Sequence, residues 1–310
     1  MTVTRRFFCR GTFAAALAAP FGPIPSIAAE TAKTGAGLLT RPIPSSGEQM
    51  PIVGLGTWIT FNVGDDPKLL AECINVVRAF FTGGGRMIDS SPMYGSSQDT
   101  IGHALAQLNY PEALFSAEKV WTSGDGAEQI EQSRTEWGVP RFDLMQVHNL
   151  VDWKDQLRLL EDMKSEGRLR YIGLTTSHGL RHGQMEQIIK RHPIDFIQIT
   201  YNVVDRDAEQ RLLPLARDRG VAVIVNRPYR QGALIRRFER HPLPDWAATE
   251  VAAESWSQFL LKFIISHPDI TCAIPATTRV DHVRENLACA RQALPDADQR
   301  KRMADFVAQL

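Results

Sequence analysis

The chain has 310 residues, of which 44% are hydrophobic and 23% are charged. This composition is typical of a globular protein and excludes a disordered or fibrous one. Lys plus Arg total 35, as do Asp plus Glu, so the formal net charge is zero and lacks the basic excess of a nucleic-acid-binding protein. Four cysteines are too few and too scattered for a disulfide scaffold or a CxxC metal site.

The N-terminal segment has the pattern of an export signal. Arg5-Arg6 precedes an apolar, alanine-rich run at 11–19, and small residues follow as far as Ala28 and Ala29. A positive segment, a short apolar segment and a small-residue cleavage site, in that order, are typical of a signal peptide. The paired arginines resemble a twin-arginine signal. We therefore expect cleavage of residues 1–29 near Ala28 or Ala29, and an exported or periplasmic protein that uses the twin-arginine machinery.

Two consequences follow from this prediction. The apolar run is short and is followed by Pro20 and Pro23, so no stable membrane span is expected. The twin-arginine route carries proteins that have already folded in the cytoplasm, which makes this chain a candidate for insertion of a cofactor before export. A disordered tail that happens to contain two arginines is the alternative interpretation.

From residue 52 onward, short apolar runs alternate with longer segments of helical period. This alternation predicts buried parallel strands covered by helices. The predicted strands are 52–58, 86–91, 114–121, 143–149, 171–176, 195–202, 221–228 and 272–277. Helical patterns occupy 68–81, 100–108, 155–164, 185–190, 208–217 and 256–265. Eight strands and the chain length favour an α/β fold, a (β/α)8 TIM barrel that forms a single domain over 30–310.

In such a barrel the active site lies at the carboxyl ends of the strands. Asp89 lies near the end of the second predicted strand, Tyr94 follows it, and Lys119 and His148 lie near the ends of the third and fourth. An ion pair between Lys119 and Asp89 would place an ammonium near Tyr94 and lower the pKa of its phenol from about 10. Tyr94 is then a workable general acid for a carbonyl oxygen, and His148 a second donor to it. A structural ion pair beside a packed tyrosine ring is the alternative.

Several motifs resemble those of one family. The run GRMIDSSPMYGSS at 85–97 is similar to the signature of the aldo-keto reductases, and Lys119 in EKVW and His148 in QVHN stand where that family keeps its other catalytic residues. GLGTW at 54–58 and IPAT at 274–277 match further motifs on the first and eighth strands. The resemblance covers roughly residues 40 to 295.

The resemblance implies a barrel that binds NADP(H) in extended form, without a Rossmann fingerprint; the chain has no GxGxxG motif after a strand. It implies a tetrad of Asp89, Tyr94, Lys119 and His148, with Tyr94 as the proton donor in the reduction of an aldehyde or ketone. Trp58 and Trp121 would line the substrate opening. The cofactor would contact Thr175, Thr176, Gln198, Asn226 and Arg227 at the nicotinamide end, and Thr277, Thr278, Arg279, Glu285 and Asn286 at the adenosine end.

The chain departs from the family in places that bear on the cofactor. Asn226 stands where the family has an aromatic residue that stacks on the nicotinamide. Thr175 and Thr176 replace a Ser-Asn pair, and Arg279 is the best candidate cation for a 2′-phosphate, because a guanidinium suits bidentate phosphate recognition. NAD(H) therefore stays open beside NADP(H).

Other functions are less well supported. His178 and His182 are four residues apart, a spacing that places two metal ligands on one helix face, but no carboxylate-rich motif accompanies them and we expect no metal. GSS at 95–97 is not a GxSxG nucleophile elbow. A barrel of the same family that senses a nucleotide or binds a partner with little turnover is the second hypothesis. The expected partner is a small-molecule carbonyl substrate of unspecified identity.

Overall fold

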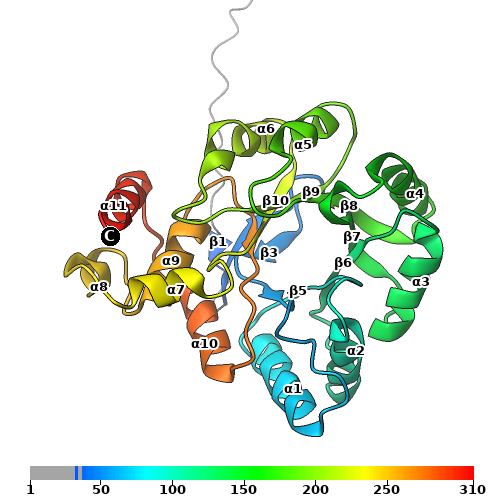
Figure 1. Ribbon diagram of the computed structural model, residues 1–310, viewed down its shortest axis with the longest axis horizontal. Helices are drawn as coiled ribbons and strands as arrows, with labels where there is room; N and C mark the ends of the chain where they lie inside the picture. The colour runs from blue at the N-terminus through cyan, green and yellow to red at the C-terminus, as the bar shows by residue number, and fades with distance from the viewer. Residues whose placement is uncertain (1–31, 34–36) are drawn as a thin grey trace, which may run out of the picture.

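The computed structural model describes residues 32–33 and 37–310. The predicted signal segment therefore lies outside the described residues. Figure 1 shows the strands at the centre of the molecule with the helices arranged around them, which is the architecture of a barrel. Within the described part of the chain, no helix is both long and apolar enough to cross a membrane.

Eight parallel strands form the sheet of this barrel. Their order is β4 to β11 in sequence order, each strand pairing with the next. The strands are β4 (Leu55–Gly56), β5 (Met87–Asp89), β6 (Phe115–Val120), β7 (Phe142–Val147), β8 (Leu169–Thr175), β9 (Phe196–Thr200), β10 (Ala222–Asn226) and β11 (Cys272–Ala273). Parallel bridges from Val53 to Ala273 and from Gly56 to Ala276 join the first strand to the last. The predicted (β/α)8 fold is confirmed.

Helices connect successive strands and cover the outside of the barrel. They are α1 (Pro67–Thr82), α2 (Ser97–Gln107), α3 (Gly126–Trp137), α4 (Trp153–Ser165), α5 (His182–Ile189), α6 (Leu212–Asp218), α7 (Ala233–Phe238), α8 (Trp246–Glu250), α9 (Trp256–Ile265), α10 (Val280–Cys289) and α11 (Ala297–Val307), with 3-10 turns η1 (His148–Leu150) and η2 (Asp207–Gln210). The predicted helix over 256–265 coincides with α9.

Local sequence explains where α1 begins and which face it buries. The Asp66 side chain accepts hydrogen bonds from two backbone N–H groups of the first turn, and Pro67 occupies the first helical position, where no N–H is needed. Cys73, Val76, Val77 and Phe80 recur at helical spacing and are buried against the barrel.

The structure corrects the single helix predicted over 208–217. It consists of η2 and α6, separated at Arg211, whose φ of −143° is not helical. Pro214 is the third residue of α6 and has no N–H to donate. A helix that continued from Ala208 would place this proline in its interior, where the pyrrolidine ring clashes with the preceding turn, so the chain restarts the helix just before it.

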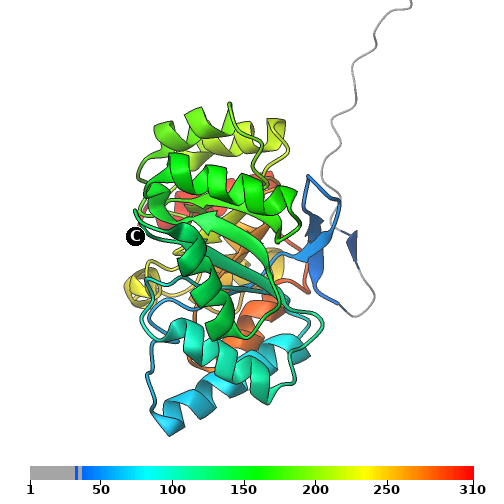
Figure 2. The same cartoon turned by 90° about the vertical axis from the view of Figure 1, so that its right-hand side faces the viewer.

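A second sheet, not predicted from the sequence, closes the amino-terminal end of the barrel. It has three antiparallel strands in the order β1 (Ala32–Lys33), β2 (Leu39–Pro42) and β3 (Gln49–Pro51), and projects to one side of the barrel in Figure 2. Its Ile43 and Met50 join a buried cluster of barrel-interior side chains. These are Met87, Phe115, Ala117, Leu144, Tyr171, Phe196, Ala222, Ile224, Cys272 and Ile274.

We expect Met50→Ala to lower the free energy of unfolding by about 2–5 kcal/mol, because Met50 is fully buried and the substitution leaves a cavity at the end of the barrel. Urea unfolding followed by circular dichroism measures the change. Met93→Ala is the matched control, since Met93 is 39% exposed and little packing is lost there. Equal effects of the two substitutions would contradict the interpretation that this sheet packs against the barrel interior and closes its amino-terminal end.

Candidate functional site

A buried ion pair joins β5 to β6 at the carboxyl end of the barrel. The Lys119 Nζ donates to Oδ1 of Asp89 at 2.6 Å and also to the carbonyl of Ser90. The Lys119 side chain is fully buried and that of Asp89 is 2% exposed. Burial disfavours a charged ammonium, but attraction to Asp89 and, to a lesser extent, to Tyr94 and Glu118 outweighs burial and raises the pKa of Lys119. Lys119 is therefore a fixed cation.

Two glutamine side chains donate hydrogen bonds to the second carboxylate oxygen of Asp89. Gln146 Nε2 donates to Oδ2 at 3.2 Å, and Gln198 Nε2 donates to the same atom at 2.8 Å. Gln198 was expected near the nicotinamide; in the structure its amide turns toward Asp89, and its Oε1 accepts from Asn226 Nδ2 at 3.4 Å. Asp89 is thus held by three side-chain donors, which fixes its carboxylate and, through it, Lys119.

Tyr94 lies above this pair and is half-buried. Its ring centre is 5.0 Å from Lys119 Nζ. The sequence predicted a lowered phenol pKa, and this prediction is wrong in direction. Burial raises the pKa of Tyr94, the charge of Lys119 lowers it by less, and the carboxylates of Asp89 and Glu118 raise it further. Tyr94 therefore keeps its proton at neutral pH.

His148 lies beside Tyr94 at the end of β7. The two rings meet edge to face, with centres 5.8 Å apart and planes at 86°. His148 Nδ1 is 2.7 Å from the hydroxyl oxygen of Ser91. Burial, followed by repulsion from Lys119, lowers the pKa of His148 to about 3. The imidazole is therefore neutral, and of Tyr94, Lys119 and His148 only Lys119 is charged.

This lowered pKa predicts how His148 responds to acid. The unfolded chain protonates a histidine near 6.5, and the folded chain only near 3, so the stability contributed by the neutral imidazole is complete above about pH 6.5 and is lost as the pH falls toward 3. We expect the His148 ring resonances in NMR spectra, assigned by comparison with His148→Asn, to show no titration between about pH 5 and 8. This range brackets the ordinary pKa of histidine. A midpoint near 6.5 would contradict the buried, neutral assignment.

Aromatic side chains surround the open side of the cluster. The Trp58 ring centre is 6.3 Å from that of Tyr94, and the Trp121 ring centre is 6.4 Å from that of His148. Trp121 is 41% exposed. The two tryptophans named from the sequence therefore lie next to the two polar rings, and the exposed face of Trp121 is accessible to an entering ligand.

The predicted nicotinamide-end residues gather at the ends of β8, β9 and β10. Thr175 Oγ1 accepts from the Asn149 backbone at 3.0 Å, whereas the buried Oγ1 of Thr176 has no hydrogen-bond partner in the described structure. Asn226 donates to the Thr176 carbonyl at 2.9 Å and accepts from Thr200 Oγ1 at 2.7 Å. Asn226 is thus fixed by hydrogen bonds across three strand ends.

Arg227 follows Asn226 and lies over Trp58, with its guanidinium carbon 5.9 Å from the ring centre. It is half-buried and adopts a left-handed conformation with φ of 52°. Among residues 37–310, no carboxylate lies within ion-pair distance of it, whereas the neighbouring Arg230 pairs with Asp205. Arg227 therefore has donors to offer to a ligand.

The predicted adenosine-end residues lie after β11 and on α10, and several are engaged within the protein. Exposed Arg279 forms an ion pair with exposed Asp281, and Thr277 Oγ1 is 3.2 Å from His282 Nδ1. Thr278 is exposed. Glu285 accepts from Ser255 and Ser257, and Asn286 accepts from Tyr229 at 3.0 Å. The guanidinium of Arg279 thus already has a carboxylate partner.

The two histidines considered for a metal do not share a helix face. His178 lies in the loop after β8 with φ of 62°, and Arg181, with φ of 58°, precedes the first turn of α5, which begins at His182. These left-handed residues interrupt the helix that the spacing assumed. Across the part of the chain that the structure describes, no group of three or more His, Cys, Asp or Glu side chains is arranged to hold a metal ion.

Sequence reasoning did not identify Ser91, Gln146 and Glu118. Gln146 precedes His148 by two residues, so the period of a strand places both on one face, a signal that was available. Glu118 points away from the barrel interior, fully buried, and accepts from Gln98 Nε2 at 3.0 Å and Trp137 Nε1 at 2.8 Å. Burial raises the pKa of Glu118 to about 8.

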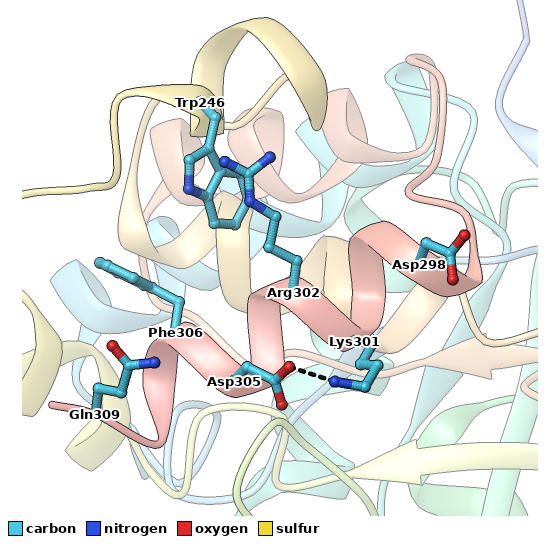
Figure 3. A pocket seen from close by; sticks show the side chains of 7 residues that line it. All are labelled: Trp246, Asp298, Lys301, Arg302, Asp305, Phe306 and Gln309. Carbon is cyan, nitrogen blue, oxygen red and sulfur yellow. Dashed lines mark hydrogen bonds and ion pairs between the residues drawn. The ribbon is translucent and has the colours of Figure 1, made fainter.

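A surface hollow elsewhere on the molecule is separate from this cluster. Figure 3 shows it between α8 and α11, lined by Trp246, Arg302, Phe306 and their neighbours. Arg302 stacks on the Trp246 ring at 4.3 Å, and Lys301 pairs with Asp305 at 2.6 Å. None of its lining residues belongs to the polar cluster, and Lys301, Arg302 and Asp305 are each already in an ion pair.

The strand ends of this parallel barrel bring together a tyrosine, a neutral histidine and a buried lysine–aspartate pair. These are the groups of an acid–base enzyme. The sequence matches the model of the aldo/keto reductase family over residues 52–305. The chain belongs to this family. It is accordingly an oxidoreductase that uses NAD(P)H and acts on carbonyl groups.

Individual relatives are distant. The chain is 24% identical to the NADH-specific methylglyoxal reductase of Escherichia coli (strain K12), over 83% of this chain and 95% of that protein. It is 27% identical to the uncharacterized oxidoreductase YtbE of Bacillus subtilis, over 78% and 84%. Among solved structures, an aldo/keto reductase of Klebsiella pneumoniae in complex with NADP and acetate superposes with a TM-score of 0.71 at 21% identity, covering 84% of this chain and 93% of that one. These likenesses support the fold.

Proposed function

We propose that this protein reduces an aldehyde or ketone to an alcohol with NADP(H), and that Tyr94 is the proton donor. The observation that carries the proposal is the convergence of Tyr94 and His148, two neutral hydrogen-bond donors, beside the buried pair of Lys119 and Asp89. A carbonyl oxygen that gains negative charge is stabilised by such preorganised donors.

The residues present fit a nicotinamide dinucleotide. Thr176 Oγ1 is buried without a partner, and Arg227 has no carboxylate partner in the described chain, so both have hydrogen-bonding capacity for amide and phosphate groups. When bound, the dinucleotide supplies a hydride to the carbonyl carbon. The Klebsiella pneumoniae structures hold NADP or NADPH, which supports NADP(H). The Escherichia coli relative is NADH-specific, and Arg279 is already paired, so NAD(H) is the alternative.

Each member of the cluster has a distinct part in the proposed reaction. Tyr94 keeps its proton until the carbonyl oxygen becomes basic, and then transfers it. Lys119 stabilises the phenolate that this transfer leaves, because an ammonium 5.0 Å from the ring centre favours the charged form of the phenol. Asp89 holds Lys119 in place. His148 orients the carbonyl through a second hydrogen bond, while Trp58 and Trp121 contact the rest of the substrate.

The direct test measures oxidation of NADPH and NADH by the purified protein with a panel of aldehydes and ketones. Turnover that depends on both the nucleotide and the carbonyl compound is expected. Tight binding of nucleotide, seen as fluorescence quenching, without turnover of any compound would overturn the reductase proposal and favour the second hypothesis, a barrel that senses a nucleotide or binds a partner.

We also propose that residues 1–29 direct export through the twin-arginine route and are cleaved near Ala28 or Ala29. The support is the order of the Arg5-Arg6 pair, the apolar run and the small residues. In a bacterium with this pathway, Arg5→Lys/Arg6→Lys is expected to retain the uncleaved protein in the cytoplasm, as judged by cell fractionation and N-terminal sequencing. Unchanged export of the double variant would overturn the proposal.

A further inference from the structure

Ser91 connects the two neutral donors of the site. Its backbone carbonyl accepts from the Tyr94 N–H at 2.9 Å, which shapes the turn that carries Tyr94. Its hydroxyl oxygen lies 2.7 Å from His148 Nδ1 and accepts from the Met93 N–H at 3.2 Å. The side chain is fully buried. Ser91, two residues after the end of β5, therefore contacts both the Tyr94 turn and the His148 ring.

The position of one proton follows from these contacts. The hydroxyl of Ser91 has a single hydrogen, and its oxygen already accepts from Met93. Within the described structure, Nδ1 of His148 is the acceptor within reach of that hydrogen. If Nδ1 instead carried a hydrogen and donated it, the buried Ser91 O–H would have no acceptor. Buried polar groups in proteins are rarely left without a hydrogen-bond partner.

We propose that Ser91 is a positioning residue whose hydroxyl donates to Nδ1 of His148 and thereby keeps the imidazole hydrogen on Nε2, where it faces the substrate carbonyl. This inference rests on the proposed function for the role of the donor, but the tautomer itself does not depend on turnover. The nitrogen that carries the hydrogen in a neutral histidine is set by the bond that the other nitrogen makes.

The surroundings of the ring agree with this assignment. His148 Nε2 has no hydrogen-bond partner among the described residues and is not among their buried, unpartnered side-chain atoms. It is therefore the ring nitrogen that an entering molecule can reach, between Tyr94 and Trp121. With hydrogens on Nε2 and on the Tyr94 oxygen, the site presents two donors, and a carbonyl oxygen can accept from both.

The first experiment observes the tautomer in the folded, full-length protein labelled with 15N-histidine. In the wild type, Nδ1 of His148 is expected to resonate as a nitrogen with a free lone pair, and Nε2 as one that carries hydrogen. In Ser91→Ala, we expect loss of this single state, with both nitrogens moving toward exchange-averaged positions. A hydrogen on Nδ1 in the wild type, or an unchanged spectrum in Ser91→Ala, would overturn the proposal.

The second experiment measures rates. Ser91→Ala is expected to lower kcat about 10-fold, less than the 10²–10³ that follows removal of a donor outright, while the dissociation constant of NADPH stays unchanged. Ser91→Thr retains the hydroxyl and is expected to restore the rate and the tautomer. Ser116→Ala is the matched control, since Ser116 is equally buried but bonds to Asp143 at the other end of the barrel, so wild-type kcat is expected.

The outcomes separate the two proposals. A wild type that turns over no carbonyl compound would overturn the proposed function, and the NMR spectrum would still decide the role of Ser91. Wild-type kcat in Ser91→Ala, or equal loss in Ser91→Ala and Ser91→Thr without a tautomer change, would overturn the positioning role and leave the proposed function standing.

Discussion

Tyr94→Phe is expected to lower kcat by about 10²- to 10⁴-fold, the range that a positioned general acid contributes. The substitution removes only the phenol oxygen, and the ring continues to pack against His148 and Trp58. Because the Lys119–Asp89 pair does not depend on that oxygen, the dissociation constant of NADPH and the free energy of unfolding should change little. Single-turnover oxidation of NADPH with a good aldehyde substrate measures the chemical step directly.

Tyr110→Phe is the matched control, because Tyr110 is 43% exposed and stands apart from the cluster. It should retain the wild-type rate. The acid assignment would be wrong if Tyr94→Phe also retained that rate. If kcat fell together with NADPH affinity and with the free energy of unfolding, the hydroxyl of Tyr94 would have a structural role in addition to acid catalysis.

The burial of Tyr94 also predicts the shape of its pH dependence. A phenol whose pKa is raised stays protonated across neutral pH, so the rate of reduction should not fall on the alkaline side until the pH passes above 10, the ordinary pKa of the group. In the reverse direction, alcohol oxidation needs the phenolate, and it should become faster as the pH rises. The positive charge of Lys119 lowers the pKa of Tyr94 and so offsets part of the increase caused by burial.

The strands of the barrel could be predicted from the sequence because parallel strands are buried on both faces. Runs such as 195–202 and 221–228 are almost continuously apolar, and the observed β9 and β10 lie within them. The hairpin of β2 and β3 gave no such signal. Its strands are short and each ends on a proline, Pro42 and Pro51, which is tolerated at a strand end but is read as a break in the sequence.

The site could be predicted where it depends on strand ends and could not where it depends on burial or on distant contacts. The proximity of Asp89, Lys119 and His148 could be predicted because they lie at or near the carboxyl ends of three neighbouring strands. The direction of the Tyr94 pKa does not, because desolvation depends on the whole fold. Ser91 and His148 are 57 positions apart in the sequence, and their contact arises only when β5 and β7 lie in one barrel.

The same dependence on burial makes the fold sensitive to loss of the ion pair between Lys119 and Asp89. We expect Lys119→Met to lower the free energy of unfolding by about 3–5 kcal/mol, because it leaves the carboxylate of Asp89 buried without its cation. The amides of Gln146 and Gln198 remain as donors to Asp89 but carry no net charge. Urea unfolding at neutral pH measures the loss, and turnover should fall as well, because no cation stabilises the Tyr94 phenolate.

A double variant separates the buried charge from the lost packing. Asp89→Asn/Lys119→Met removes both charges and keeps the shape of each side chain, so it should recover most of the stability lost in Lys119→Met while remaining poorly active. Lys301→Met is the matched control at an exposed pair, where Lys301 and Asp305 lie one helical turn apart and 0–1 kcal/mol is the typical contribution. If Lys119→Met cost no more than this control, the buried pair would not stabilise the fold and the prediction would be wrong. If the double variant were no more stable than Lys119→Met, the loss would come from packing, and Asp89 would not be the group that requires the charge of Lys119. Recovery of stability without recovery of turnover is the result that assigns Lys119 to the chemistry of Tyr94 as well as to the fold.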